Sequence, residues 1–246
     1  MAARKSASKS TAAKPAAKRR AGPNSKSAQS ATNAARKAVI ATALAMSRGG
    51  LSPGRSGNVS MRWRDGMLIT PSGMAYETLK PADIVYVDGD GSVAGKARKP
   101  SSEWRFHLSA YHARSDRSAV VHTHSLNATA LACQHKSIPA FHYMVAAAGG
   151  KEVPCIPYAS FGTDELAQHV ARGLSRHDAC LMANHGQIAI GQTLDGALEL
   201  ANEIETLAAQ YIRVLAMGKP KILSSRRMDD VLARFKTYGQ NAQKRG

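Results

Sequence analysis

The stretch 100–125, PSSEWRFHLSAYHARSDRSAVVHTHS, predicts a helix followed by a buried strand. Its residues 101–103 (Ser-Ser-Glu) are typical of a helix start, because hydroxyl groups cap free backbone N–H groups and an acidic side chain is favoured in the first turn. The apolar run 119–121 then leads into His122 and His124. Side chains two residues apart on a strand point to the same face. We therefore expect two neighbouring imidazoles on one face of the strand. A helix followed by a strand forms a hairpin-like pair, which can bring the start of the helix back toward these imidazoles.

A metal site is one interpretation of this pattern. A third imidazole, His185, follows a second apolar run at 179–183, and Glu103 offers a carboxylate. Three histidines and one carboxylate are a common set of zinc ligands, of which the carboxylate can leave to admit substrate. The alternative is that His122 and His124 are ordinary core histidines satisfied by hydrogen bonds. The spacing of these residues alone does not decide between the two.

The distribution of charge separates a basic tail from the rest of the chain. The formal net charge is +17 over 246 residues, yet residues 1–37 contain ten Lys or Arg and no acidic residue. Removing these ten leaves 24 basic residues against 17 acidic ones. Residues 1–32 are rich in Ala, Ser, Lys and Pro, which favours a disordered tail before a single domain at 33–246. Such a tail is either a solvated segment or a tether for sequence-independent contact with nucleic acid.

Neither secretion nor membrane insertion is indicated. The longest apolar run near the front, 38–46, is too short to span a bilayer, and no secretory signal precedes it. The three cysteines, Cys133, Cys155 and Cys180, are odd in number and far apart, as in a reduced protein. We expect a cytoplasmic protein with no membrane partner.

The remaining patterns predict an α/β fold, a single domain with a central, mainly antiparallel sheet flanked by helices. Strand-like alternation at 58–64 is joined to 67–70 by the turn Asp65-Gly66, and 84–88 forms a further strand. Short strands joined by tight turns argue against repeated βαβ units. Helical patterns occur at 34–48, 127–133, 164–174, 194–217 and 229–236.

Ten sequence blocks carry a resemblance to a known family. They are GNVS (57–60), LITPSG (68–73), PSSEWRFH (100–107), VVHTH (120–124), IPAFHYM (138–144), AAGG (147–150), PYA (157–159), FGT (161–163), NHG (184–186) and FKTYG (235–239). From about residue 36 to 239 the chain closely resembles the class II, zinc-dependent aldolase and adducin family. Within that family it is most similar to the members that cleave L-fuculose 1-phosphate.

The resemblance implies a metal centre and a phosphate site. It implies one Zn²⁺, or another divalent ion, per subunit, held by Glu103, His122, His124 and His185. The implied ligands of the substrate phosphate are Gly57, Asn58, Ser72, Gly73, Ser101 and Ser102. Taken singly, each of these loops is better explained as a plain turn or cap, although exposed N–H groups and helix starts suit anions.

Two tyrosines complete the catalytic set that the resemblance implies. Tyr143 matches an acid/base tyrosine that serves a neighbouring subunit, and Tyr238 matches one that closes over the active site. A homotetramer with active sites between subunits is therefore implied. The implied reaction is cleavage of a ketose 1-phosphate, L-fuculose 1-phosphate first, to dihydroxyacetone phosphate and L-lactaldehyde.

Several alternatives remain open at this stage. The family's sugar-phosphate epimerases usually have Asp where this chain has Glu103, which favours cleavage. Dehydratases and decarboxylases of the family share the metal set. A non-catalytic, adducin-like interaction module is the alternative from a different class of function.

Overall fold

The computed structural model describes residues 25–237, and it corrects the predicted start of the first helix. Helix α1 spans Ser25–Arg48, so residues 25–32, assigned above to the tail, are helical. This segment contains neither Gly nor Pro, and it extends a helix in which Ala35 is the first buried residue among those whose burial is described. Residues 1–24 of the predicted tail, with the proposed nucleic-acid contact, lie outside the described residues, as does Tyr238.

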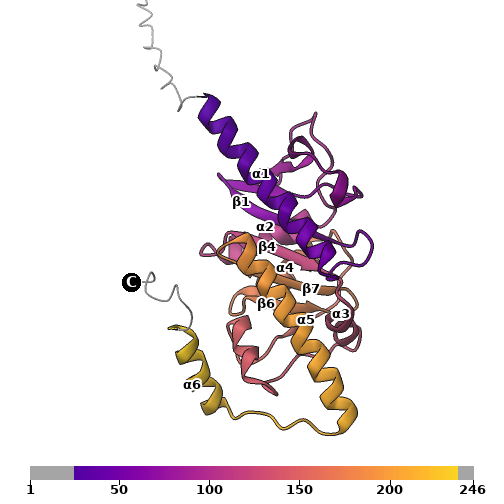
Figure 1. The fold of residues 1–246 in the computed structure, drawn as a ribbon, viewed down its shortest axis with the longest axis vertical. Helices are drawn as coiled ribbons and strands as arrows, with labels where there is room; N and C mark the ends of the chain where they lie inside the picture. The colour runs from indigo at the N-terminus through magenta and orange to yellow at the C-terminus, as the bar shows by residue number, and fades with distance from the viewer. Residues whose placement is uncertain (1–24, 238–246) are drawn as a thin grey trace, which may run out of the picture.

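A seven-stranded sheet forms the centre of the fold (Figure 1). Its strands are β1 (Gly57–Trp63), β2 (Gly66–Ile69), β3 (Val85–Val87), β4 (Ala119–Thr123), β5 (Cys155–Ile156), β6 (Ala179–Met182) and β7 (Gly186–Gly191). The order across the sheet is β3-β2-β1-β4-β7-β6-β5, and every neighbouring pair is antiparallel except β5 with β6. The predicted mainly antiparallel α/β fold is therefore confirmed.

Helices cover both faces of this sheet (Figure 1). One face carries α1 and the long α5 (Leu194–Met217), and the other carries α2 (Trp104–Ala113) and α4 (Asp164–Leu174). The shorter α3 (Leu126–Cys133) follows β4, and α6 (Ser225–Phe235) packs against the 3₁₀ helix η3 (Tyr143–Ala148). Two further 3₁₀ turns, η1 (Tyr76–Thr78) and η2 (Pro81–Asp83), lie between β2 and β3. No helix within residues 25–237 is both long and apolar enough to cross a membrane.

Strand β4 sits at the centre of the sheet, and all five of its residues are buried. Successive side chains alternate faces, so Val121 packs with α1 and α5, whereas Val120 packs with α2 and α4. His122 shares the face of Val120 and meets the ring of Phe106 on α2 edge-on. The strand therefore directs His122 toward the first turn of α2, where Glu103 lies.

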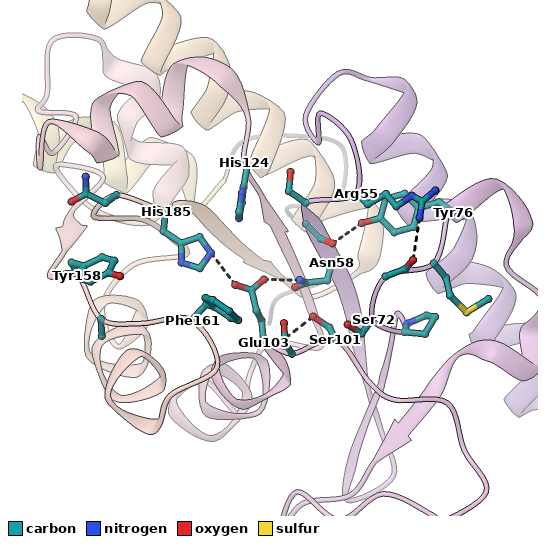
Figure 2. Close-up of a pocket in the computed structure, with 18 residues that line it drawn as sticks. Arg55, Asn58, Ser72, Tyr76, Ser101, Glu103, His124, Tyr158, Phe161 and His185 are labelled. Atoms are coloured by element: carbon teal, nitrogen blue, oxygen red, sulfur yellow. Dashed lines mark hydrogen bonds and ion pairs between the residues drawn. The ribbon is translucent and has the colours of Figure 1, made fainter.

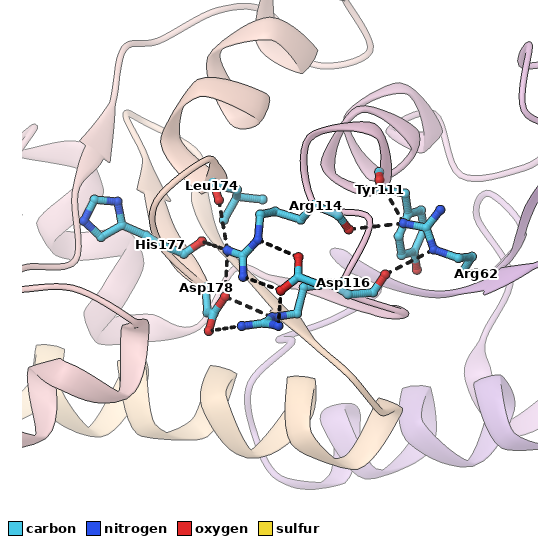
Figure 3. A network of polar contacts seen from close by, with 8 residues as sticks. Arg62, Tyr111, Arg114, Asp116, Leu174, His177 and Asp178 are labelled. Atoms are coloured by element: carbon cyan, nitrogen blue, oxygen red, sulfur yellow. Dashed lines mark hydrogen bonds and ion pairs between the residues drawn. The ribbon is translucent and has the colours of Figure 1, made fainter. Parts of the chain in front are cut away.

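A polar network fixes the other end of α2 (Figure 3). Arg114, the residue after α2, donates to the carbonyls of Leu174 and His177 at the end of α4. Its guanidinium also pairs with Asp116 at 2.9 Å and with Asp178 at 2.9 Å. Because both ends of α2 are held, the helix presents its first residues to the sheet in a defined position.

Candidate metal centre and substrate pocket

Four side chains from distant parts of the chain converge on one point. Glu103, His122, His124 and His185 each offer a ligand atom, and these atoms lie within 4.8 Å of one another. Glu103 Oε1 lies 2.8 Å from His185 Nε2, and Glu103 Oε2 lies 3.2 Å from His122 Nε2. His122 Nε2 lies 3.0 Å from His124 Nε2. The structure thus brings together the four residues proposed from the sequence as metal ligands.

Hydrogen bonds behind the cluster set how His122 faces it. His122 Nδ1 lies 2.8 Å from the backbone oxygen of Gln187, which can only accept, so Nδ1 carries the proton. In the neutral ring Nε2 then presents its lone pair to the cluster, 3.0 Å from His124 Nε2. The Gln187 side chain is anchored in turn by donating to Ser125 Oγ and to the carbonyl of Ala201. An ordered imidazole with an inward lone pair is what a metal ligand requires.

The electrostatic environment favours the protonation states that bind a cation. Burial alone would raise the pKa of Glu103, but the adjacent imidazoles of His122 and His185 outweigh it and hold that pKa well below its usual range. Burial, followed by the neighbouring imidazoles, lowers the pKa of His124 to about 3. An ionised carboxylate at Glu103 and a neutral imidazole at His124 are the ligating forms of these two groups. The donor set is consistent with a divalent metal ion.

The turn that carries His185 depends on close backbone packing. Asn184 adopts the left-handed conformation (φ 53°), and its Oδ1 accepts from His135 Nε2 at 2.6 Å. The next residue but one, Gly186, starts β7, and a Cβ there would lie 2.4 Å from the backbone oxygen of Thr123. The absence of that Cβ lets β7 begin against the end of β4. His185 and His124 are brought together for this reason.

A pocket of about 440 Å³ opens beside the cluster (Figure 2). Glu103, His124 and His185 line it, whereas His122 is fully buried behind it. The six residues proposed to bind phosphate line the same pocket: Gly57, Asn58, Ser72, Gly73, Ser101 and Ser102. The Ser101 backbone N–H donates to the carbonyl of Thr70, and Ser101 Oγ accepts from the backbone of Glu103, which ties the helix start to the sheet.

Sequence reasoning missed two residues at the end of the pocket away from His185 (Figure 2). Arg55 donates through Nη1 to the carbonyl of Gly73 at 3.3 Å and adds a cation beside the candidate phosphate loops. Tyr76 donates to the carbonyl of Gly57 at 2.5 Å, and burial raises its pKa to about 12. A basic side chain two residues before Gly57 was the available signal for Arg55. Nothing in the pattern of the sequence marked Tyr76.

Two aromatic rings lie at the opposite end of the pocket, beside His185 (Figure 2). Tyr158 is 57 % exposed and Phe161 is 70 % exposed, although both are large aromatic side chains. Apolar rings left in contact with solvent at the edge of a polar site can receive the apolar part of a ligand. Both rings lie in sequence blocks that carry the family resemblance, but the sequence predicts no role for either of them.

Of the two tyrosines proposed as catalytic, Tyr143 does not line this pocket. Tyr143 begins η3 and is 51 % exposed. Tyr238 lies outside the described part of the chain. The role of Tyr143 in the site of a neighbouring subunit therefore stays a prediction.

Comparison with known proteins gives consistent results. Residues 37–212 match the family model described as "Class II Aldolase and Adducin N-terminal domain". The L-fuculose phosphate aldolase of Escherichia coli (strain K12) is 50 % identical over 202 residues, which cover 82 % of this chain and 94 % of that protein. The 5-methylthioribulose-1-phosphate/5-deoxyribulose-1-phosphate aldolase of Rhodospirillum rubrum is 50 % identical over 210 residues, 85 % of this chain and 95 % of that protein. A solved structure of an L-fuculose 1-phosphate aldolase superposes with a TM-score of 0.79 at 38 % identity, covering 82 % of this chain and 96 % of the other.

Proposed function

The chain belongs to the class II aldolase and adducin family and is a class II aldolase, and on this premise we propose that it cleaves L-fuculose 1-phosphate to dihydroxyacetone phosphate and L-lactaldehyde. One observation carries the proposal. The pocket is lined by a carboxylate and two imidazoles, and a third imidazole lies behind them. The same pocket is lined by glycines and hydroxyl groups that are suited to binding phosphate. A ketose 1-phosphate has its phosphate next to the carbonyl and hydroxyl oxygens that a metal can hold. The pocket offers both contacts together.

We assign the metal centre to Glu103, His122, His124 and His185, with Zn²⁺ as the first candidate ion. Imidazole nitrogen and carboxylate oxygen are among the ligands that Zn²⁺ prefers, and an exchangeable carboxylate leaves room for substrate. An ion held there would supply Lewis acidity that stabilises negative charge developing on the ketose oxygens. Because all four metal ligands are present, the non-catalytic, adducin-like interaction module is disfavoured.

The phosphate end of the pocket orients the reacting carbons. Backbone N–H groups at Gly57 and Gly73 and the hydroxyls of Ser72 and Ser102 would bind the phosphate, assisted by the helix start at Ser101. Asn58 belongs to this set, and Arg55 would add positive charge. Fixing the phosphate at one end places the C3–C4 bond beside Glu103, which lowers the entropic cost of reaching the transition state.

Proton transfer falls to two side chains. Glu103 faces the pocket and would move the proton at the carbon that becomes part of dihydroxyacetone phosphate. Its ionised carboxylate would remove that proton in the condensation direction, and the carboxyl group, once protonated from solvent, would deliver it to the carbon in cleavage. Tyr143 of a neighbouring subunit would move the proton on the oxygen that becomes the aldehyde, and Tyr238 would close the site. The exposure of Tyr143, away from its own chain's pocket, supports such a role in a homotetramer.

A second candidate substrate is 5-methylthioribulose 1-phosphate or its 5-deoxy analogue. Two observations favour it: the Rhodospirillum rubrum relative is as similar as the fuculose-phosphate enzyme, and Tyr158 and Phe161 expose aromatic rings at the far end of the pocket. An aldehyde fragment with a terminal methylthio group is largely apolar, and sulfur packs favourably on aromatic rings.

A coupled assay distinguishes these substrates. Dihydroxyacetone phosphate released from L-fuculose 1-phosphate, 5-methylthioribulose 1-phosphate or 5-deoxyribulose 1-phosphate is reduced by glycerol-phosphate dehydrogenase with consumption of NADH. The proposal expects the highest kcat/KM for L-fuculose 1-phosphate. A kcat/KM at least tenfold higher for the methylthio or deoxy sugar assigns the second function instead. L-ribulose 5-phosphate serves as the epimerase control, and its conversion to xylulose 5-phosphate without cleavage of the other sugars would refute both aldolase assignments.

A further inference from the structure

A chain of buried hydrogen bonds runs from the candidate base into the core behind the pocket. Glu103 Oε2 lies 2.8 Å from Asn58 Nδ2, and Asn58 Oδ1 lies 2.5 Å from His107 Nε2. His107 Nδ1 lies 2.7 Å from Ser60 Oγ, which lies 2.8 Å from the hydroxyl of Tyr111. All five residues are buried. Figure 2 shows the first contact, between Glu103 and Asn58.

Chemistry fixes the direction of every bond in this chain. The ionised carboxylate of Glu103 can only accept, so the amide nitrogen of Asn58 faces it and its carbonyl oxygen faces His107. That oxygen also can only accept, so His107 carries its proton on Nε2. Burial lowers the pKa of His107 to about 3, which leaves the ring neutral and its Nδ1 free to accept from Ser60. The single hydroxyl proton of Ser60 is then used.

Tyr111 must therefore donate to Ser60, and all four hydrogen bonds point toward the carboxylate. The far end of the chain is held by Arg62, whose guanidinium lies 4.9 Å from the centroid of the Tyr111 ring and donates to the Tyr111 carbonyl (Figure 3). Aligned donors polarise one another in a low-dielectric interior. The arrangement stabilises a negative carboxylate in one orientation and offers it no competing acceptor.

We propose that His107 is a positioning residue for the aldol reaction, which locks the amide of Asn58 so that it donates to Glu103 and fixes that carboxylate beside the substrate carbon. The proposal rests on the assignment of Glu103 as the base. His107 touches neither the pocket nor the substrate, since it is fully buried and absent from the pocket lining. It acts only by preventing the Asn58 amide from turning its oxygen toward the carboxylate.

The same geometry gives Asn58 two tasks. One N–H of its amide is used by Glu103, and the other remains for the phosphate end of the pocket. The position of the base and the position of the substrate then both depend on this one amide group. His107 sets the orientation of that amide.

Nuclear magnetic resonance tests the direction of the chain without substrate. In zinc-loaded protein labelled with ¹⁵N-histidine, long-range ¹⁵N–¹H correlations report which ring nitrogen of each histidine is protonated. The His107 ring is assigned through its stacking on Phe106, at 5.0 Å between centroids. We expect a neutral ring with Nε2 protonated. A ring protonated on Nδ1, or on both nitrogens, would overturn the proposal, whatever sugar the enzyme cleaves.

Kinetics at saturating Zn²⁺ test the consequence for catalysis. His107→Leu removes the donor, and we expect kcat to fall about 10- to 100-fold, the range for residues that orient a metal-site ligand. KM should rise as well, because the freed Asn58 amide also loses its fixed position at the phosphate end of the pocket. His107→Gln places an amide N–H near the position of Nε2 and should recover at least half of the loss on a logarithmic scale. The proposal would be contradicted if both variants had the kcat of the wild type. It would also be contradicted if a folded His107→Gln variant recovered none of the kcat lost in His107→Leu.

Ser109→Ala provides the matched control. Ser109 lies on the same helix and donates to the carbonyl of Ala167, outside the chain that leads to Glu103. Its variant loses one partly buried hydrogen bond between α2 and α4 but leaves the orientation of Asn58 intact, so kcat should stay within about twofold of wild type. A fall in kcat equal to that of His107→Leu would show that disturbing α2 is sufficient and would refute the specific role of His107.

Discussion

Gly186→Ala is expected to disrupt the metal centre without altering any ligand. The added Cβ would lie 2.4 Å from the backbone oxygen of Thr123 and 3.0 Å from Cδ2 of His124. Carbon–oxygen contacts in proteins are about 3.3 Å or longer. The start of β7 and the end of β4 must therefore separate by about 1 Å. Neither strand segment can move at low energetic cost, because each is backbone of a central strand that is hydrogen-bonded to the other.

The size of the effect follows from this displacement. His124 follows β4 and His185 precedes β7, so a shift of about 1 Å changes the distance between two ligands by several times the tolerance of about 0.2 Å expected at a metal site. Overpacking of this kind costs about 1–3 kcal/mol of folding stability. A misplacement of about 1 Å at reacting groups can cost about 100-fold in rate. We expect zinc affinity to fall more than tenfold and kcat/KM about 100-fold.

Three measurements check this prediction: zinc content after equilibration with a competing chelator, kcat/KM in the coupled assay, and the free energy of unfolding in urea. Gly95→Ala is the matched control, because no atom lies within 4 Å of a Cβ built there. It should change stability by less than about 0.5 kcal/mol and leave zinc binding intact. If Gly186→Ala bound zinc as tightly as Gly95→Ala and turned over normally, the close approach of the two strands would not be what places the ligands.

Three further predictions concern single side chains. Glu103→Gln should leave a folded protein with aldol activity lower by on the order of 100-fold, as for loss of an acid/base group, and near-normal turnover would refute that role. His124→Ala should lose bound metal and activity together, and a variant that kept both would refute its assignment as a ligand. Asp116→Asn should weaken the acid dependence of stability. Arg114 holds the pKa of Asp116 at about 2 against about 3.9 in the unfolded chain, so the stabilisation is present above about pH 4 and lost toward pH 2. Because Asp116 is half exposed, the stabilisation amounts to less than about 1 kcal/mol. The measurement is the fall in thermal midpoint between pH 7 and pH 2.5 for each protein. An equal fall in the wild type and in the variant would contradict the prediction.

Much of the fold was predictable because local signals were strong. The helical pattern at 194–217 gave the limits of α5, and the pattern at 164–174 gave those of α4, which Thr163 caps by accepting from the backbone N–H of Leu166. The turn Asp65-Gly66 placed the β1–β2 hairpin. By contrast, β5 has only two residues and is held by parallel pairing to β6, so it has no alternation to detect. The early start of α1 was missed because residues 27–34 include no buried side chain and leave no periodic pattern.

Some residues of the candidate site were likewise predictable from the sequence, and others were not. Histidines at the ends of apolar runs carry a visible pattern, and the structure places His122, His124 and His185 around Glu103. His107 carries no such pattern, because one histidine on a helix face looks like any packed residue. Its role depends on Ser60 and Asn58, which come from a strand 47 and 49 residues away in the chain. Such contacts exist only once β1 lies against α2.

The end of β4 gives a packing role to two glycines, Gly57, which the family resemblance implied as a phosphate ligand, and Gly186. A Cβ at Gly57 of β1 would lie 2.9 Å from the backbone oxygen of His122, and a Cβ at Gly186 of β7 would lie 2.4 Å from that of Thr123. Each edge of β4 is therefore approached by a glycine, one from each neighbouring strand. The residue after the first is Asn58, which holds Glu103, and the residue before the second is His185, which also contacts it. Because the two glycines let both strands close on β4, they set the separation of the groups that hold the carboxylate from its two sides.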